Sequence, residues 1–222
     1  MSNLLFETRF VDAKTIIFFG IALFIACGNT SLDRPSNAQA TPRLVQTPVE
    51  RDKGDDLVVR LSDLYDAKNC VGFFNAFPST FSEFEQLYGF SDQLGEQPLY
   101  RKYEGHLQYF LHCPEISSRA RLEKLIGIGV GGRWDADATA MIQDASYDLI
   151  KESPTEACEI LNGLPDSQAS SFWYFVLDGP HPKDRATIER MNVLKNALGN
   201  ETKQLRLLTV QYQELIRNPP SH

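Results

Sequence analysis

Residues 141–156 read Met-Ile-Gln-Asp-Ala-Ser-Tyr-Asp-Leu-Ile-Lys-Glu-Ser-Pro-Thr-Glu and carry a clear fold signal. Apolar side chains recur at helical spacing through the first half of this stretch, which predicts an amphipathic helix. Ser153 then stands at a cap position, Pro154 at the first helical position and Glu156 at the third, so a second helix begins at once. Two helices with almost no linker between them indicate a fold built from packed helices.

Helical signals continue on both sides of this stretch. A Thr80-Phe81-Ser82-Glu83 capping box opens one short helix, and Gly89 is expected to end it in the left-handed conformation. Further helices are expected around the apolar residues of 57–65, 99–111 and 172–176, and in a last pair at 183–198 and 201–217. No run of alternating strand residues is evident. We therefore predict an all-α fold over residues 55–222, either a compact multi-helix bundle or a short helical array.

Composition and charge exclude one broad class of function. The chain has 222 residues, of which 42% are hydrophobic and 23% charged, as in ordinary globular proteins. Its formal net charge is −7, and no cluster of Lys and Arg is present. Such a surface repels phosphate backbones, so nucleic-acid binding is not expected. A basic protein partner is compatible with this charge.

The N-terminal segment has the layout of a signal peptide. An uncharged apolar run at residues 16–26 follows Lys14 and stops at Cys27-Gly28. A membrane-spanning helix needs roughly 20 apolar residues, and this run is about half that length. The alternative is a short hydrophobic helix followed by an unmodified cysteine.

The end of this segment, Leu23-Phe24-Ile25-Ala26-Cys27-Gly28, resembles the lipobox of bacterial lipoproteins, with Phe24 where that family usually has Leu. The resemblance implies that a lipoprotein signal peptidase cleaves before Cys27, and that acyl chains such as palmitate attach the mature protein to the membrane. Gly28 in place of Asp implies sorting to the periplasmic face of the outer membrane in a bacterium with two membranes. The resemblance covers this segment only.

A polar stretch separates the cysteine from the predicted helices. Residues 28–54 contain no aromatic side chain and several Pro, Ser, Thr, Asn and Gln, a composition typical of disorder. A flexible tether of this length would hold a domain on the order of 30 Å from the membrane. The predicted organisation is a signal peptide at 1–26, a lipidated cysteine and disordered linker at 27–54, and a helical domain at 55–222.

The other three cysteines are Cys70, Cys113 and Cys158. In an oxidising compartment they permit one internal disulfide, and the sequence leaves all three pairings open. Buried, inert thiols are the alternative. No Cys-x-x-Cys is present, so the spacing predicts neither a zinc cluster nor another cofactor.

Residues 127–132, Gly-Ile-Gly-Val-Gly-Gly, match the G-x-G-x-x-G pattern of dinucleotide-binding folds. That pattern works only within a strand–helix–strand unit, which this chain does not show. We therefore interpret the stretch as a flexible connector between helices.

Two aspartates follow this motif. Asp135 and Asp137 lie two residues apart, so their carboxylates are candidates to bind a metal cation or polarise a water molecule. The alternative is that one of them caps the next helix and the other lies near its positive end.

A second candidate site lies at Asp178-Gly179-Pro180-His181-Pro182, after a run of aromatic residues. His181 between two prolines is pre-positioned, and Asp178 could orient it as a general base or share a metal with Asp135 or Asp137. The alternative is that Asp, Gly and Pro form a turn after a helix and leave the histidine exposed.

No nucleophile elbow, Walker loop or His-Glu-x-x-His motif is present, which argues against an enzyme without excluding one. The first hypothesis is a non-catalytic, lipid-anchored envelope protein whose acidic surface binds a basic partner, as an immunity protein binds a toxin. The second is a small envelope hydrolase or metal-dependent enzyme that uses Asp178 and His181.

Overall fold

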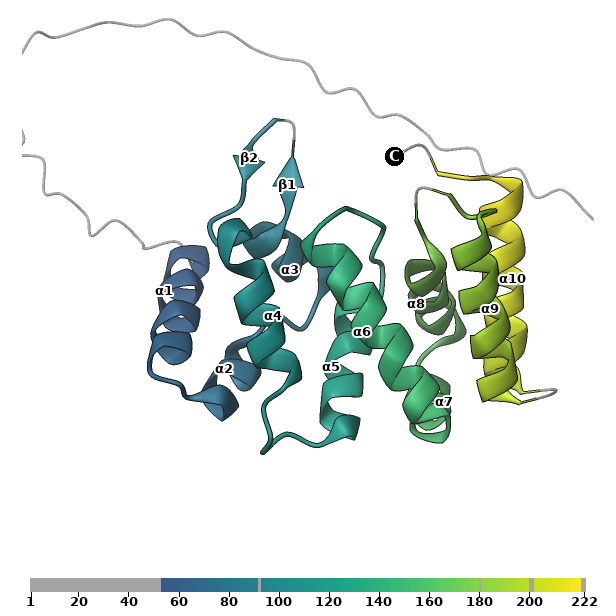
Figure 1. The fold of residues 1–222 in the computed structure, drawn as a ribbon, viewed down its shortest axis with the longest axis horizontal. Coiled ribbons are helices and arrows are strands. Elements are labelled where there is room, and N and C mark those ends of the chain that lie inside the picture. Colours follow the sequence, from purple (N-terminus) through teal and green to yellow (C-terminus); the bar gives the residue numbers. More distant parts are fainter. Residues whose placement is uncertain (1–52, 92, 180, 200–201, 221–222) are drawn as a thin grey trace, which may run out of the picture. The chain divides into compact units, whose positions relative to one another are not determined.

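A computed structural model describes residues 53–91, 93–179, 181–199 and 202–220 (Figure 1). The predicted signal peptide, Cys27 and nearly all of the predicted linker lie outside the described residues. Within them, the chain forms ten α-helices and one very short β-hairpin. The prediction of an all-α, compact helical array is confirmed.

After a first helix of 14 residues, the first part of the domain consists of short elements. In chain order, this part contains α1 (Lys53–Asp66), α2 (Cys70–Ala76), α3 (Phe81–Tyr88), β1 (Phe90–Ser91), β2 (Gly95–Glu96), the 3-10 helix η1 (Tyr100–Lys102) and α4 (Tyr103–Leu111). The Thr80 side chain accepts a hydrogen bond from the Glu83 backbone N–H at the start of α3, as the capping box predicted. The expectation of a left-handed Gly89 was wrong: its φ is −75°, because the chain passes directly from α3 into extended strand β1.

The hairpin was not predicted. Strands β1 and β2 pair antiparallel, with Phe90 opposite Glu96 and Ser91 opposite Gly95. Each strand has only two residues, too few to show the alternation by which strands are recognised in a sequence.

The second part has longer helices. They are α5 (Ser118–Gly129), α6 (Ala138–Glu152), α7 (Pro154–Asn162), α8 (Asp166–Leu177), α9 (Arg185–Leu198) and α10 (Lys203–Arg217). Pro154 is the first residue of α7, as predicted, although the Ser153 side chain makes no capping hydrogen bond. Figure 1 shows α6 in the middle of the described domain, where it contacts α4 and α5 as well as α8 and α9. This helix therefore joins the two parts.

Only residues 130–132 of the glycine-rich motif lie in the connection between α5 and α6, so the interpretation as a connector was wrong for residues 127–129. Gly127 and Gly129 lie in the last turn of α5, and the element before α5 is helix α4, not a strand. A Cβ on Gly129 would lie 2.7 Å from Cδ1 of Phe175, and one on Gly132 would lie 2.6 Å from Cδ2 of the same ring. The glycines allow the end of α5 to approach α8 closely, which is the physical reason for the motif.

Candidate functional site

Asp178 is a buried residue at the C-terminal cap of α8. Its Oδ2 accepts a hydrogen bond of 2.6 Å from the Trp134 backbone N–H, and its carbonyl oxygen accepts one of 3.0 Å from the buried Gln143 side chain. The carboxylate therefore ties the segment before α6 to the end of α8. This is a structural role, and it accounts for an aspartate here without catalysis.

His181, the predicted partner of Asp178, is exposed in the turn that leads to α9. Its carbonyl oxygen accepts a hydrogen bond of 3.0 Å from the Asp184 backbone N–H. Hydrogen bonds from Thr187 hold the pKa of Asp184 below its ordinary value, and the nearby His181 lowers it further. An exposed imidazole in a turn agrees with the turn interpretation of this segment. The catalytic pair stays a prediction.

Asp137 occupies the N-cap position of α6, as the alternative interpretation placed it, but its side chain makes no capping hydrogen bond. Its backbone has φ of +58°, and its Oδ2 accepts a short hydrogen bond from the Tyr100 hydroxyl. That hydrogen bond raises the pKa of Tyr100 to about 12. Asp135 accepts a hydrogen bond of 2.8 Å from the Ala136 N–H, while burial raises the pKa of its carboxyl group. The two aspartates therefore have different local partners.

A different set of residues brings three potential ligand atoms close together. Within the described residues, only Cys70, Cys113 and Glu115 form a group of three His, Cys, Asp or Glu side chains whose ligand atoms all lie within 4.8 Å of one another. The predicted set of Asp135, Asp137, Asp178 and His181 forms no such group there.

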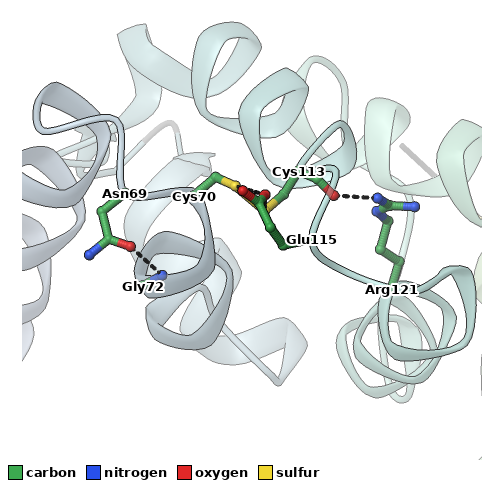
Figure 2. Close-up of a disulfide and its surroundings, with 6 residues drawn as sticks. All are labelled: Asn69, Cys70, Gly72, Cys113, Glu115 and Arg121. Atoms are coloured by element: carbon green, nitrogen blue, oxygen red, sulfur yellow. Dashed lines mark hydrogen bonds between the residues drawn. A yellow bond between two sulfur atoms is a disulfide. The ribbon is translucent and has the colours of Figure 1, made fainter.

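Cys70 and Cys113 form a disulfide, with 5.6 Å between their Cα atoms (Figure 2). This is one of the three pairings that the sequence left open. It joins the first residue of α2 to the loop after α4, across a sequence separation of 43 residues. Cys158 is a free, half-buried thiol whose pKa is raised by burial.

Glu115 lies against the disulfide (Figure 2). Its Oε2 is 2.9 Å from Sγ of Cys70 and 3.3 Å from Sγ of Cys113. Two neighbouring contacts hold the backbone of this cluster. The Asn69 side chain caps α2 by accepting a hydrogen bond of 2.9 Å from the Gly72 N–H, and Arg121 donates one of 2.5 Å to the Cys113 carbonyl oxygen.

A groove of about 510 Å³ lies between α4, α5 and α6. Asp144, Asp148 and Glu152 line it from α6, and their spacing of four residues places them along one face of that helix. His112 and Arg121 line it from the other side. Asp144 pairs with Arg190, and Asp148 pairs with Lys151 at 2.8 Å. The acidic repeat is visible in the sequence, but only the tertiary structure places it beside a groove.

Comparison of the chain with protein-family models, with curated proteins and with solved structures finds no match. In the described part of the chain, every helix is too short or too polar to cross a membrane.

Proposed function

We propose that the protein is a lipid-anchored envelope protein that binds a basic segment of another protein and catalyses no reaction. The observation that carries the binding role is the acidic face of α6, where Asp144, Asp148 and Glu152 line the groove between α4, α5 and α6. All three side chains are exposed, and Asp144 and Asp148 form ion pairs with Arg190 and Lys151.

Two features support export and anchoring. The lipobox-like segment that ends at Cys27-Gly28 supplies the acylated residue, and the tether after it keeps the domain near the bilayer surface. The disulfide between Cys70 and Cys113 supports the same location, because disulfides persist in oxidising compartments such as the periplasm. The proposed location is the cell envelope, at the periplasmic face of the outer membrane where a second membrane exists.

The groove suits a basic, partly apolar segment. Carboxylates four residues apart on a helix repeat about every 6 Å, so they can face a row of Lys or Arg side chains. Leu111, Met141 and Leu149 line the same groove and offer apolar contact. Binding would exchange the Arg190 and Lys151 ion pairs for pairs with the partner. A basic toxin is one such partner, which would make the protein an immunity protein.

Anchoring is tested by intact-mass analysis and membrane fractionation of the native protein and of Cys27→Ser. We expect a membrane-associated mature chain that begins at acylated Cys27, and loss of both acylation and membrane association in the variant. An unprocessed, unacylated wild-type chain would contradict the proposed anchor.

Binding is tested with a synthetic amphipathic peptide rich in Lys and Leu, followed by fluorescence anisotropy at low and high salt. The groove variant carries Asp144→Asn, Asp148→Asn and Glu152→Gln. A control variant with the same change in net charge carries three exposed substitutions outside the groove, namely Asp56→Asn, Asp63→Asn and Glu189→Gln.

The groove variant should lose roughly tenfold in affinity at low salt, because each exposed charge pair contributes about 0.5 kcal/mol. The control variant should bind like the wild type. Equal losses in the two variants would mean that only net charge matters, and this would contradict the groove as the binding site. Recovery of a basic partner from envelope extracts by the wild type and the control, but not by the groove variant, would identify the natural ligand class.

A further inference from the structure

The short loop after α4 brings Glu115 against the disulfide, but the contact contains no hydrogen bond in the oxidised state. An ionised carboxylate only accepts hydrogen bonds, and a disulfide sulfur carries no hydrogen to donate. Yet Oε2 of Glu115 lies 2.9 Å and 3.3 Å from the two sulfurs. Such a contact is favourable when the cysteines are reduced, either as thiols that donate to the carboxylate or as thiolates that share a cation with it.

We propose that Cys70 and Cys113, once reduced, form with Glu115 a binding site for a divalent zinc ion. Two thiolates and one carboxylate are ligands that Zn²⁺ accepts, and a water molecule would complete a tetrahedral set. The site does not depend on the proposed binding groove.

The backbone geometry fits this ligand set. Zinc–sulfur bonds of about 2.3 Å in a tetrahedral site place the two sulfurs about 3.8 Å apart. The Cα atoms of Cys70 and Cys113 are 5.6 Å apart, so rotation of the side chains is enough to reach that separation. Cys113 is buried, with 1% of its surface exposed, whereas Cys70 is half-buried and Glu115 is exposed. Zinc therefore has access from the solvent, and Cys70 is the ligand with room to move.

The neighbouring contacts hold the ligands in place and offset their charge. The Asn69 cap fixes the start of α2, where Cys70 lies, and Arg121 fixes the Cys113 carbonyl group. Two thiolates and a carboxylate with one Zn²⁺ leave a net charge of about −1. Arg121, held at the Cys113 carbonyl oxygen, supplies a positive charge in the neighbourhood of the site.

The disulfide and the zinc site are alternative states of one cluster. In the presence of a low-molecular-weight disulfide, the Cys70 thiolate attacks one sulfur and expels a small thiolate. The Cys113 thiolate then attacks the Cys70 sulfur of this mixed disulfide and expels the second small thiolate. One protein S–S bond forms, the small disulfide takes up two electrons, and Zn²⁺ is released. Oxidation therefore empties the site.

The test uses the full chain with Cys27→Ser and Cys158→Ser, which leaves Cys70 and Cys113 as the remaining cysteines. This parent is reduced with a phosphine, freed of metal, and titrated with Co²⁺ followed by absorption and with Zn²⁺ followed by calorimetry. We expect one ion per chain, thiolate-to-cobalt charge-transfer bands, and no binding after reoxidation. Circular dichroism and melting temperature report the fold, and Zn²⁺ should raise the melting temperature of the reduced chain.

Substitutions in the parent separate the site from nonspecific binding. Cys70→Ser and Cys113→Ser should each weaken the charge-transfer bands and lower the affinity for Zn²⁺. Glu115→Gln leaves both cysteines intact and should lower the affinity roughly tenfold or more. Glu104→Gln, an exposed acid on α4, is the matched control and should bind like the parent.

Three results would overturn the proposal: a folded reduced parent that binds no ion, equal affinity in Glu115→Gln and the parent, or a reduced parent that stays unfolded at saturating Zn²⁺.

Discussion

The regions of α1–α4 and α8–α10 achieve stability in different ways. Helices α2, α3 and α4 have seven, eight and nine residues, and they bury a dense set of aromatic rings. Phe77 stacks on Phe110 with 4.3 Å between ring centroids, and the ring of His106 lies 4.7 Å from that of Tyr65. The Cys70–Cys113 disulfide adds a covalent link.

The second region relies on longer helices, and a buried polar contact joins α8 to α10. Helices α8, α9 and α10 have 12, 14 and 15 residues. Trp173 is fully buried and donates a hydrogen bond of 2.9 Å to Gln204, which is also fully buried and bonds to Asn162. Short helices are poorly stable on their own, so the first region depends on packed aromatic rings and a cross-link. The longer helices of the second region gain their stability from the apolar surface that they bury against one another.

The largest expected effect is loss of the disulfide. Replacing Cys70 and Cys113 together by Ser should lower the free energy of unfolding by about 4 kcal/mol, given a sequence separation of 43 residues. Urea denaturation measures the loss, and hydrogen exchange should locate the faster-exchanging amides in α1–α4. Cys158→Ser is the control and should leave stability nearly unchanged. Faster exchange mainly in α8–α10 would contradict the claim that the disulfide stabilises the first region in particular.

The next effect is the pH dependence conferred by His106. Burial lowers the pKa of this histidine from 6.5 to about 4, so the fold holds it neutral. The unfolded chain binds a proton below pH 6.5 and the folded chain does not, so stability is lost as the pH falls from about 6.5 to about 4.

Below pH 4 the free energy of unfolding is lower by roughly 3 kcal/mol, since each pKa unit corresponds to about 1.4 kcal/mol. His106→Gln, which can still bond to the Tyr88 hydroxyl, should lack this part of the pH dependence. Urea denaturation of both chains at several pH values measures it. Parallel curves for the two chains would contradict a buried neutral histidine in the first region.

A smaller effect is expected in the second region. Gln204→Leu removes the acceptor of the Trp173 indole N–H and leaves a buried donor unsatisfied, which should cost about 2 kcal/mol. Gln213→Leu, an exposed glutamine on the same helix, is the matched control and should change stability by less than about 0.5 kcal/mol. Equal effects would mean that α10 does not depend on its buried polar contact.

The smallest effects compare two glycines. Gly129→Ala should destabilise the fold by about 1 kcal/mol, because its Cβ would press on Phe175 where α5 meets α8. Gly54→Ala in α1 has no heavy atom within 4 Å of its Cβ and should stabilise the fold by about 0.5 kcal/mol. Thermal melts of both variants measure the difference. The same sign in both would argue against close packing at the end of α5.

The sequence predicted the helices that carry strong local signals. The helices at 57–65, 154 onward and 183–198 lie where periodicity and caps indicated them. Helices α2 and α5 were missed, since α2 has only seven residues and glycines interrupt the apolar pattern at the end of α5. Both are stabilised by contacts with other segments of the chain, and patterns of periodicity and capping within a helix do not report such contacts.

The candidate sites were less predictable. Asp137 stands where a helix cap was expected, but its side chain bonds to Tyr100, a residue 37 positions earlier. Asp178 was singled out as a candidate base, and the structure shows it as a buried acceptor for the Trp134 backbone. A sequence shows which side chains can accept a hydrogen bond, but their partners come from elements far away in the chain.

By itself, the sequence determined that this chain is an all-α protein without a nucleic-acid-binding charge pattern, because helical periodicity, caps and net charge are local or summed properties. It also supplied the lipobox-like pattern at Cys27. Only the tertiary structure chose the Cys70–Cys113 pair among three and brought Glu115 to its sulfurs. The physical reason is distance along the chain: a pairing across 43 residues depends on how α1 to α4 pack, and no local pattern encodes it.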